Sequence, residues 1–256
     1  MHLRASQGSF REQLGRWTVI CLFLGLMTVD LFARPVVAKL ALSSGTLALY
    51  FGISILNGLV VAALSMFLEW WRCSVVSTLA LACRINPRER ILRMGAIGFI
   101  CGAMALAYVL SLWGLFALTT LIILLTLAHM RRFMHGIAGL LRPNRRPSWQ
   151  DIGFLVHIYI TVLAALTTLT ISLELLSFSL GKAPAFHGAI MTGEATMIDA
   201  FYFSIVVMTT LGFGDITPAT PAAKLLVSFM CLTGYAMFAL IIGVVTRGIT
   251  TNEEDD

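Results

Sequence analysis

Residues 209–218 have the sequence Thr-Thr-Leu-Gly-Phe-Gly-Asp-Ile-Thr-Pro, a polar, glycine-containing stretch in an otherwise strongly apolar chain. Of the 256 residues, 58% are hydrophobic and only 12% are charged, and the mean hydropathy is +0.88. Soluble domains carry about 25% charged residues. The composition therefore predicts an integral membrane protein, and it leaves residues 209–218 in need of a specific explanation.

The charge pattern argues against a nucleic-acid-binding protein. The formal net charge is +5 at pH 7, but the basic residues lie in short clusters between apolar segments and not along one continuous polar face. The five cysteines form no Cys-x-x-Cys pair, and we interpret them as thiols without disulfides. No pattern implies covalent chemistry, so we expect neither an enzyme nor a resident cofactor.

Apolar segments of about 20 residues cross a bilayer as helices. The apolar stretch 94–130 is too long for one crossing, so we divide it at a turn near residues 111–114. A cleaved signal peptide is the alternative for the first segment. The predicted fold is all-α, with six transmembrane spans at residues 17–33, 46–71, the two halves of 94–130, 152–180 and 221–246.

The basic residues orient these spans, because cytoplasmic loops collect Lys and Arg. With both termini inside, only four of the 18 basic residues fall on the outer side. This places residues 209–218 outside, and it divides the chain into four parts. They are a cytoplasmic N-terminus at 1–16, a four-helix transmembrane domain at 17–147, a second membrane domain at 148–248 and an acidic cytoplasmic tail at 249–256.

A short apolar segment, 197–208, precedes the opening stretch and is too short to cross a bilayer. We interpret it as a re-entrant or interfacial segment; as a helix running inward, its negative C-terminal end would favour a cation. Non-helical backbone at membrane depth must be buried in protein or line an aqueous cavity. Gly212 and Gly214 can adopt positive φ, so that successive carbonyls face one axis while Leu211 and Phe213 pack outward.

The chain returns directly into the sixth span after this stretch. Thr220 is a plausible helix N-cap, and Pro221 suits the first helical position. Four symmetric copies of such a loop would surround a dehydrated cation with oxygen atoms. The alternative is an extracellular turn between two ordinary spans.

The hexapeptide Thr210–Asp215 resembles the selectivity filter of the potassium channel superfamily, whose usual form is Thr-Val-Gly-Tyr-Gly-Asp. The resemblance extends over residues 199–247 and includes the filter-supporting positions Tyr202, Phe203, Val206 and Thr209, together with Pro218 and a possible gating hinge at Gly234. Residues 148–248 would then be a pore domain. Residues 17–147 resemble a degenerate voltage-sensor-like domain in layout only.

This resemblance implies a homotetramer in the plasma membrane, embedded in the lipid bilayer, that conducts potassium passively. Backbone carbonyls of Thr210, Leu211, Gly212 and Phe213, with the Thr210 hydroxyl, would coordinate potassium as the permeant ligand. Gly214 would complete the outer turn, and Asp215 would add negative charge at the pore mouth. Two residues depart from relatives: Phe213 lacks the usual tyrosine hydroxyl, and Val206 stands where some bacterial relatives have a glutamate.

The fourth span has no basic residue between Trp113 and Met130, so we predict weak or absent voltage gating. Three residues keep two interpretations each. His157 is a proton sensor or a packed helix residue, Glu174 braces the pore loop or reaches the membrane interface, and Gly234 is a hinge or a close helix contact. Other functions compatible with the sequence are a non-selective monovalent cation channel, a transporter subunit and a non-conducting membrane scaffold.

Overall fold

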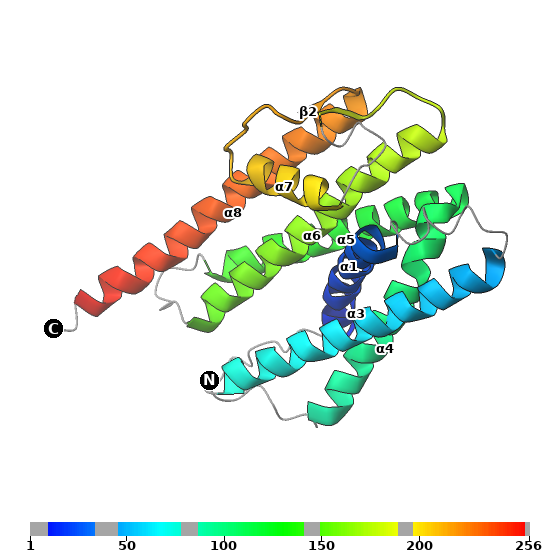
Figure 1. The fold of residues 1–256 in the computed structure, drawn as a ribbon. Helices are drawn as coiled ribbons and strands as arrows, with labels where there is room; N and C mark the ends of the chain where they lie inside the picture. Colours follow the sequence, from blue (N-terminus) through cyan, green and yellow to red (C-terminus); the bar gives the residue numbers. More distant parts are fainter. Residues whose placement is uncertain (1–9, 34–45, 78–86, 141–148, 189–196, 254–256) are drawn as a thin grey trace. The chain divides into compact units, whose positions relative to one another are not determined.

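The computed structural model describes residues 10–33, 46–77, 87–140, 149–188 and 197–253. These residues are mostly helical (Figure 1), which confirms the predicted helical class. The chain forms two compact units, Met1–Ala117 and Leu118–Asp256. The functional division at residue 148 stays a prediction.

The first unit is built on three helices that pack against one another. They are α1 (Phe10–Thr28), which continues into the π-helical turn η1 (Val29–Ala33), α3 (Thr46–Ser77) and α4 (Pro87–Leu110). Helices α3 and α4 approach closely because their contact is made by small residues: a Cβ added at Gly98 would lie 2.9 Å from the Val61 carbonyl oxygen. Small residues at such contacts let helix backbones meet within a membrane.

A buried amide joins these three helices. Asn57 on α3 is 6% exposed, and its Nδ2 donates to the Gly25 carbonyl of α1 at 3.2 Å and to the Gly102 carbonyl of α4 at 2.8 Å. Both amide protons therefore have acceptors. Close backbone packing, the Asn57 amide and a bond from the Ser65 hydroxyl of α3 to the Met94 carbonyl of α4 at 3.1 Å hold these helices together.

Helix α5 (Leu112–Leu140) begins immediately after α4 and crosses the boundary between the units. Ser111 separates the two helices: its hydroxyl accepts a hydrogen bond from the Gly114 amide at 2.9 Å, and its carbonyl accepts one from Leu115 at 2.9 Å. Ser111 is thus the N-cap of α5. This confirms the predicted break at residues 111–114.

The second unit contains α6 (Trp149–Ser179), the short helix α7 (Met197–Met208) and α8 (Pro221–Glu253). Helix α7 packs against both α6 and α8 (Figure 1). Two short strands, β1 (Phe186–His187) and β2 (Thr217–Pro218), pair antiparallel in the connections on either side of α7. The bounds of α7 match the predicted short segment.

Hydroxyl side chains on α6 are buried but satisfied within the helix. Thr167, Thr168 and Thr170 donate to the carbonyls four residues earlier, at 2.9, 2.7 and 2.9 Å. The Thr170 hydroxyl also approaches Met230 Sδ of α8 at 4.0 Å, and Ala223, Met230 and Met237 of α8 are fully buried. Because each of these hydroxyls is satisfied by a carbonyl of its own helix, the threonines can be buried against apolar side chains.

Among the described residues, three helical segments are long and apolar enough to cross a membrane: Tyr50–Trp71, Leu155–Ser179 and Pro221–Val244. Shorter apolar helical segments lie at Trp17–Leu31, Ile91–Leu106, Leu112–Ala128 and Met197–Met208. Such segments fit a multi-pass membrane protein. The full count of six spans stays a prediction.

Candidate functional site

Helix α7 ends in a hydrogen-bonded turn, and the loop begins there. The Thr210 amide donates to the Val207 carbonyl at 3.0 Å, and the Leu211 amide donates to the Val206 carbonyl at 3.0 Å. Thr210 has a φ of 61°. This is the Schellman pattern, which commonly ends a helix with one left-handed residue. It ends α7 just before the loop of residues 210–215.

The loop then alternates between left-handed and other backbone conformations. Thr210, Gly212 and Gly214 have φ values of 61°, 58° and 81°, while Leu211 and Phe213 between them have no positive φ. The positive φ predicted for both glycines is confirmed. The left-handed Thr210 was not predicted, because threonine gives no sequence signal for this conformation.

The side chains of this loop are open to their surroundings in the single chain. Leu211 is 61% exposed and Phe213 is 65% exposed, and a Cβ added at Gly212 or Gly214 would meet no atom within 4 Å. Coordination of an ion by the carbonyls of this loop stays a prediction.

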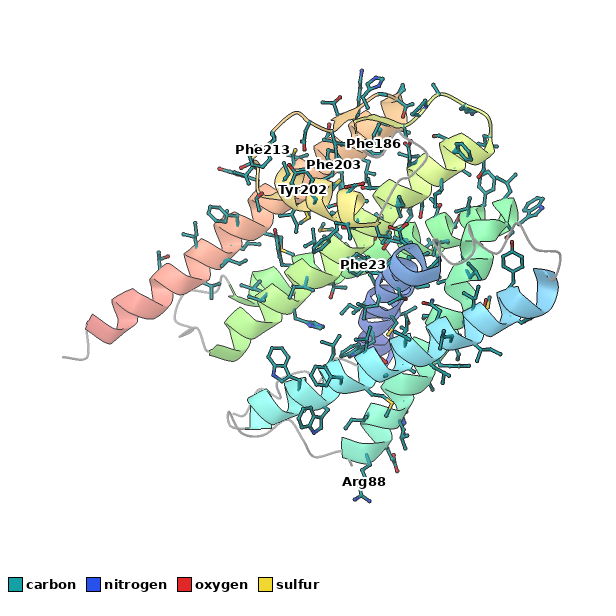
Figure 2. All side chains as sticks on the ribbon, viewed as in Figure 1. Phe23, Arg88, Phe186, Tyr202, Phe203 and Phe213 are labelled. Carbon is teal, nitrogen blue, oxygen red and sulfur yellow. The ribbon has the colours of Figure 1, made fainter. Side chains whose placement is uncertain are left out.

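Two aromatic residues on α7 have separate partners; Figure 2 labels both of them, together with Phe186, the partner of Phe203. The Tyr202 hydroxyl donates a hydrogen bond to the Asp215 carboxylate. That hydrogen bond, burial and the negative charge of Asp215 all raise the pKa of Tyr202. Phe203 is 3% exposed and meets Phe186 of β1 edge to face, with ring centroids 5.4 Å apart. Tyr202 thus contacts the outer end of the loop, and Phe203 the preceding connection.

Val206 and Thr209 make their hydrogen bonds at the C-terminal end of α7, Val206 through its backbone and Thr209 through its hydroxyl. Val206 is 5% exposed, and its carbonyl accepts from Leu211. The Thr209 hydroxyl donates to the Ile205 carbonyl at 2.7 Å, so it is directed back to its own helix. Their part in supporting a filter stays a prediction.

The loop leaves through a segment held by non-local contacts. Phe186 pairs with Pro218 and His187 with Thr217, and the Ala185 carbonyl accepts from the amide of Ala219 at 2.9 Å. The Thr220 hydroxyl accepts from the Ala223 amide at 3.3 Å, which confirms the predicted N-cap, and α8 begins at Pro221 as expected.

Glu174 reaches this same segment from α6. It is 7% exposed, and its Oε2 accepts from the amides of Ala185 at 2.8 Å and Phe186 at 3.2 Å. Of its two predicted roles, the structure supports the brace. The partners themselves were missed, because nothing in the sequence marks a pairing between residues 185–187 and 217–219.

Gly234 lies within the unbroken helix α8. A Cβ added there would overlap the Met208 carbonyl oxygen and would lie 2.7 Å from the Met208 carbonyl carbon. The glycine is therefore a close contact between α8 and the end of α7; its role as a hinge stays a prediction. His157 is half-buried on α6, where its carbonyl accepts from the Thr161 hydroxyl at 2.8 Å, and its role as a proton sensor is likewise untested.

Residues 155–251, which contain α7, the loop and most of α6 and α8, match the ion channel family. Similar proteins include the two pore potassium channel a of Oryza sativa subsp. japonica, 30% identical over 113 residues (43% of this chain and 27% of that one). The voltage-gated potassium channel of Aeropyrum pernix is 38% identical over 52 residues, which is 20% of this chain and 18% of that one. No solved structure gives a significant match.

The family match and these relatives point to an ion channel rather than to an enzyme. Residues 155–251 are similar to proteins of the potassium channel superfamily. The matched stretch spans at most about a quarter of each of the two relatives described. The chain is therefore compared with only part of each relative's length.

Proposed function

We propose that this protein is a passive, potassium-selective channel that conducts through residues 210–214. The observation that carries the proposal is the alternation of left-handed conformations at Thr210, Gly212 and Gly214, directly after a helix too short to cross the membrane. Such alternation turns successive carbonyls toward one side. A dehydrated potassium ion needs a ladder of oxygens of this kind.

The ion ligands are the carbonyls of Thr210, Leu211, Gly212 and Phe213 with the Thr210 hydroxyl. Gly214 completes the outer turn, and the exposed Asp215 raises the local cation concentration at the mouth. Potassium is the permeant ligand, and the mechanism uses no resident cofactor.

The conducting form is a homotetramer, because one chain supplies only one strand of the filter. The exposure of Leu211 and Phe213 supports this assembly, since both are large apolar side chains at the pore loop. Helix α8 also carries a set of exposed apolar residues that neighbouring copies and lipid would cover: Leu225, Leu232, Tyr235 and Phe238.

The channel resides in the plasma membrane with six spans and both termini in the cytoplasm. Its voltage dependence is weak, because residues 113–130 of α5 contain no arginine or lysine. The field acts on each charge with only about 2.3 kcal/mol per 100 mV, so a steep response needs several such residues. Steep tail currents with several gating charges per subunit would contradict this part of the proposal.

The decisive experiment is the reversal potential of the purified, reconstituted protein with potassium on one side and sodium on the other. A potassium-selective channel gives a reversal potential far from zero, with the sign set by potassium flow, because under these bi-ionic conditions the reversal potential reports the permeability ratio. Gly212→Ala should abolish the flux into liposomes, and unchanged flux in that variant would mean that the loop does not conduct.

One observation favours a second candidate, a non-selective monovalent cation channel of the same fold. Phe213 has no hydroxyl with which to bond to surrounding side chains, and it is 65% exposed in the single chain. A loosely held ring would allow the filter to adapt to sodium, and the reversal potential would then lie near zero. A transporter subunit is less well supported, because transporters usually carry paired broken segments and this sequence indicates one. A transporter would show uphill flux driven by a coupled ion gradient.

A further inference from the structure

Glu174 is a buried side chain on α6 whose carboxylate accepts hydrogen bonds from two backbone amides. It is 7% exposed, and a single oxygen, Oε2, accepts from both the Ala185 and the Phe186 amides, at 2.8 and 3.2 Å. Hydrogen bonds to a charged acceptor are roughly twice as strong as neutral ones. Glu174 therefore fixes the start of β1 to the outer part of α6.

The same short segment is bonded on its other side to the residues that follow the pore loop. The Ala185 carbonyl accepts from Ala219 at 2.9 Å and from Thr220 at 3.3 Å, and β1 pairs with β2. Ala185 thus uses its amide to bond α6 and its carbonyl to bond the start of α8. Ala185 alone therefore links Glu174 to the residues at which the chain leaves the loop.

The contact continues to the residue that ends the loop. Gly188 has a φ of +110°, and a Cβ added there would overlap the Asp215 carbonyl oxygen and would lie 3.1 Å from the Ile216 Cα. Ile216 is 6% exposed. The backbone at Gly188 therefore lies close to the outer end of the loop, leaving no room for a side chain, and it follows directly after β1.

We propose that Glu174 is a positioning residue that sets potassium-over-sodium selectivity by holding the outer end of the filter through β1, β2 and Gly188. The inference rests on the proposed function. This support comes from α6, separately from the bond between Tyr202 on α7 and Asp215. Without the carboxylate, two buried amides lose their acceptor, β1 shifts, and the Gly214–Asp215 peptide is free to turn away from the pore axis.

The test compares Glu174→Ala and Glu174→Gln with a matched control on the same helix. Glutamine keeps an acceptor oxygen of similar shape without the charge, whereas alanine removes the acceptor. Ser172→Ala is the control, because Ser172 is also fully buried but its hydroxyl bonds to the Thr168 carbonyl of its own helix at 2.6 Å.

The measurements are the potassium-to-sodium permeability ratio and the decay of potassium current during sustained conduction. Losing a hydrogen bond to a charged group should lower the ratio about tenfold in Glu174→Ala. Glu174→Gln should recover most of the ratio, and Ser172→Ala should match the wild type. A purely structural role would lower protein yield or tetramer stability and leave the ratio unchanged, which would overturn the inference.

Gly188→Ala gives a second test if Glu174→Ala does not assemble, because it displaces Asp215 while Glu174 stays in place. Its permeability ratio must also fall, and a wild-type ratio would overturn the inference. Failure of the proposed function is distinguishable: a wild-type protein without potassium preference refutes both proposals. A selective wild type with unchanged variants refutes only the role of Glu174.

Discussion

The Tyr202 hydroxyl donates a hydrogen bond to the carboxylate of Asp215, so a side chain on α7 is tied to the outer end of the loop that follows it. Tyr202→Phe removes only this donor. We expect the variant to fold, to conduct, and to show a lower potassium-to-sodium permeability ratio than the wild type. An unchanged ratio and an unchanged current time course would show that the bond does not steady the filter.

The same bond predicts a response to alkaline pH. The hydrogen bond to Asp215, burial and the carboxylate charge raise the pKa of Tyr202. A raised pKa means that the donor is fully present below the ordinary tyrosine pKa of about 10 and is lost only as pH rises through the higher value. Selectivity should therefore fall at strongly alkaline external pH in the wild type, and Tyr202→Phe should lack this fall. Reversal potentials measured across a pH series check both outcomes.

Gly234→Ala should destabilise the pore domain. The added methyl group would overlap the Met208 carbonyl oxygen, and forcing extra atoms into a packed contact costs about 1–3 kcal/mol. Gly243→Ala is the matched control on the same helix, because a Cβ there meets nothing within 4 Å. Thermal denaturation in detergent should separate the two variants. Equal stability would mean that α8 moves away from α7 without cost and would favour the hinge.

Gly212→Ala and Gly214→Ala should each impair conduction through the backbone alone. Both positions have positive φ with open space around the missing Cβ, and a side chain in the left-handed region costs about 1–2 kcal/mol. Gly52→Ala on α3, which also has open space but no positive φ, is the control. Potassium flux into liposomes should fall in the two loop variants and stay at the wild-type level in the control.

Asn57→Leu should loosen the first unit, since the Gly25 and Gly102 carbonyls would both lose their donor. Interhelical hydrogen bonds within membranes contribute about 0.6 kcal/mol on average and up to about 1.7, so the two bonds together should cost about 1–2 kcal/mol. Leu56→Ala, at a 62% exposed neighbour, is the control. A melting temperature of Asn57→Leu equal to that of the control would contradict the structural role of the amide.

Local signals in the sequence predicted the parts of the site that depend on local backbone chemistry. The short helix 197–208, the break at Ser111 and the start of α8 at Pro221 each follow from segment length, capping or proline geometry. The positive φ of Gly212 and Gly214 follows from the freedom of glycine.

Features that depend on residues distant in the chain were not predictable in the same way. The pairing of β1 with β2 involves strands of two residues each, which are too short to leave a periodic pattern. The amide partners of Glu174 depend on that pairing. Gly234 could be placed on α8 from the sequence, but its contact with Met208 required knowing how α7 and α8 pack.

Thr210 occupies a left-handed conformation that glycine would adopt without cost. Replacing it by glycine would relieve the backbone and stabilise the isolated chain, yet it would delete the only side-chain hydroxyl among the proposed ion ligands. Selection for folding and selection for conduction therefore favour different residues at position 210. Libraries screened only for expression or thermal stability should accumulate glycine there and yield well-folded proteins that no longer pass potassium.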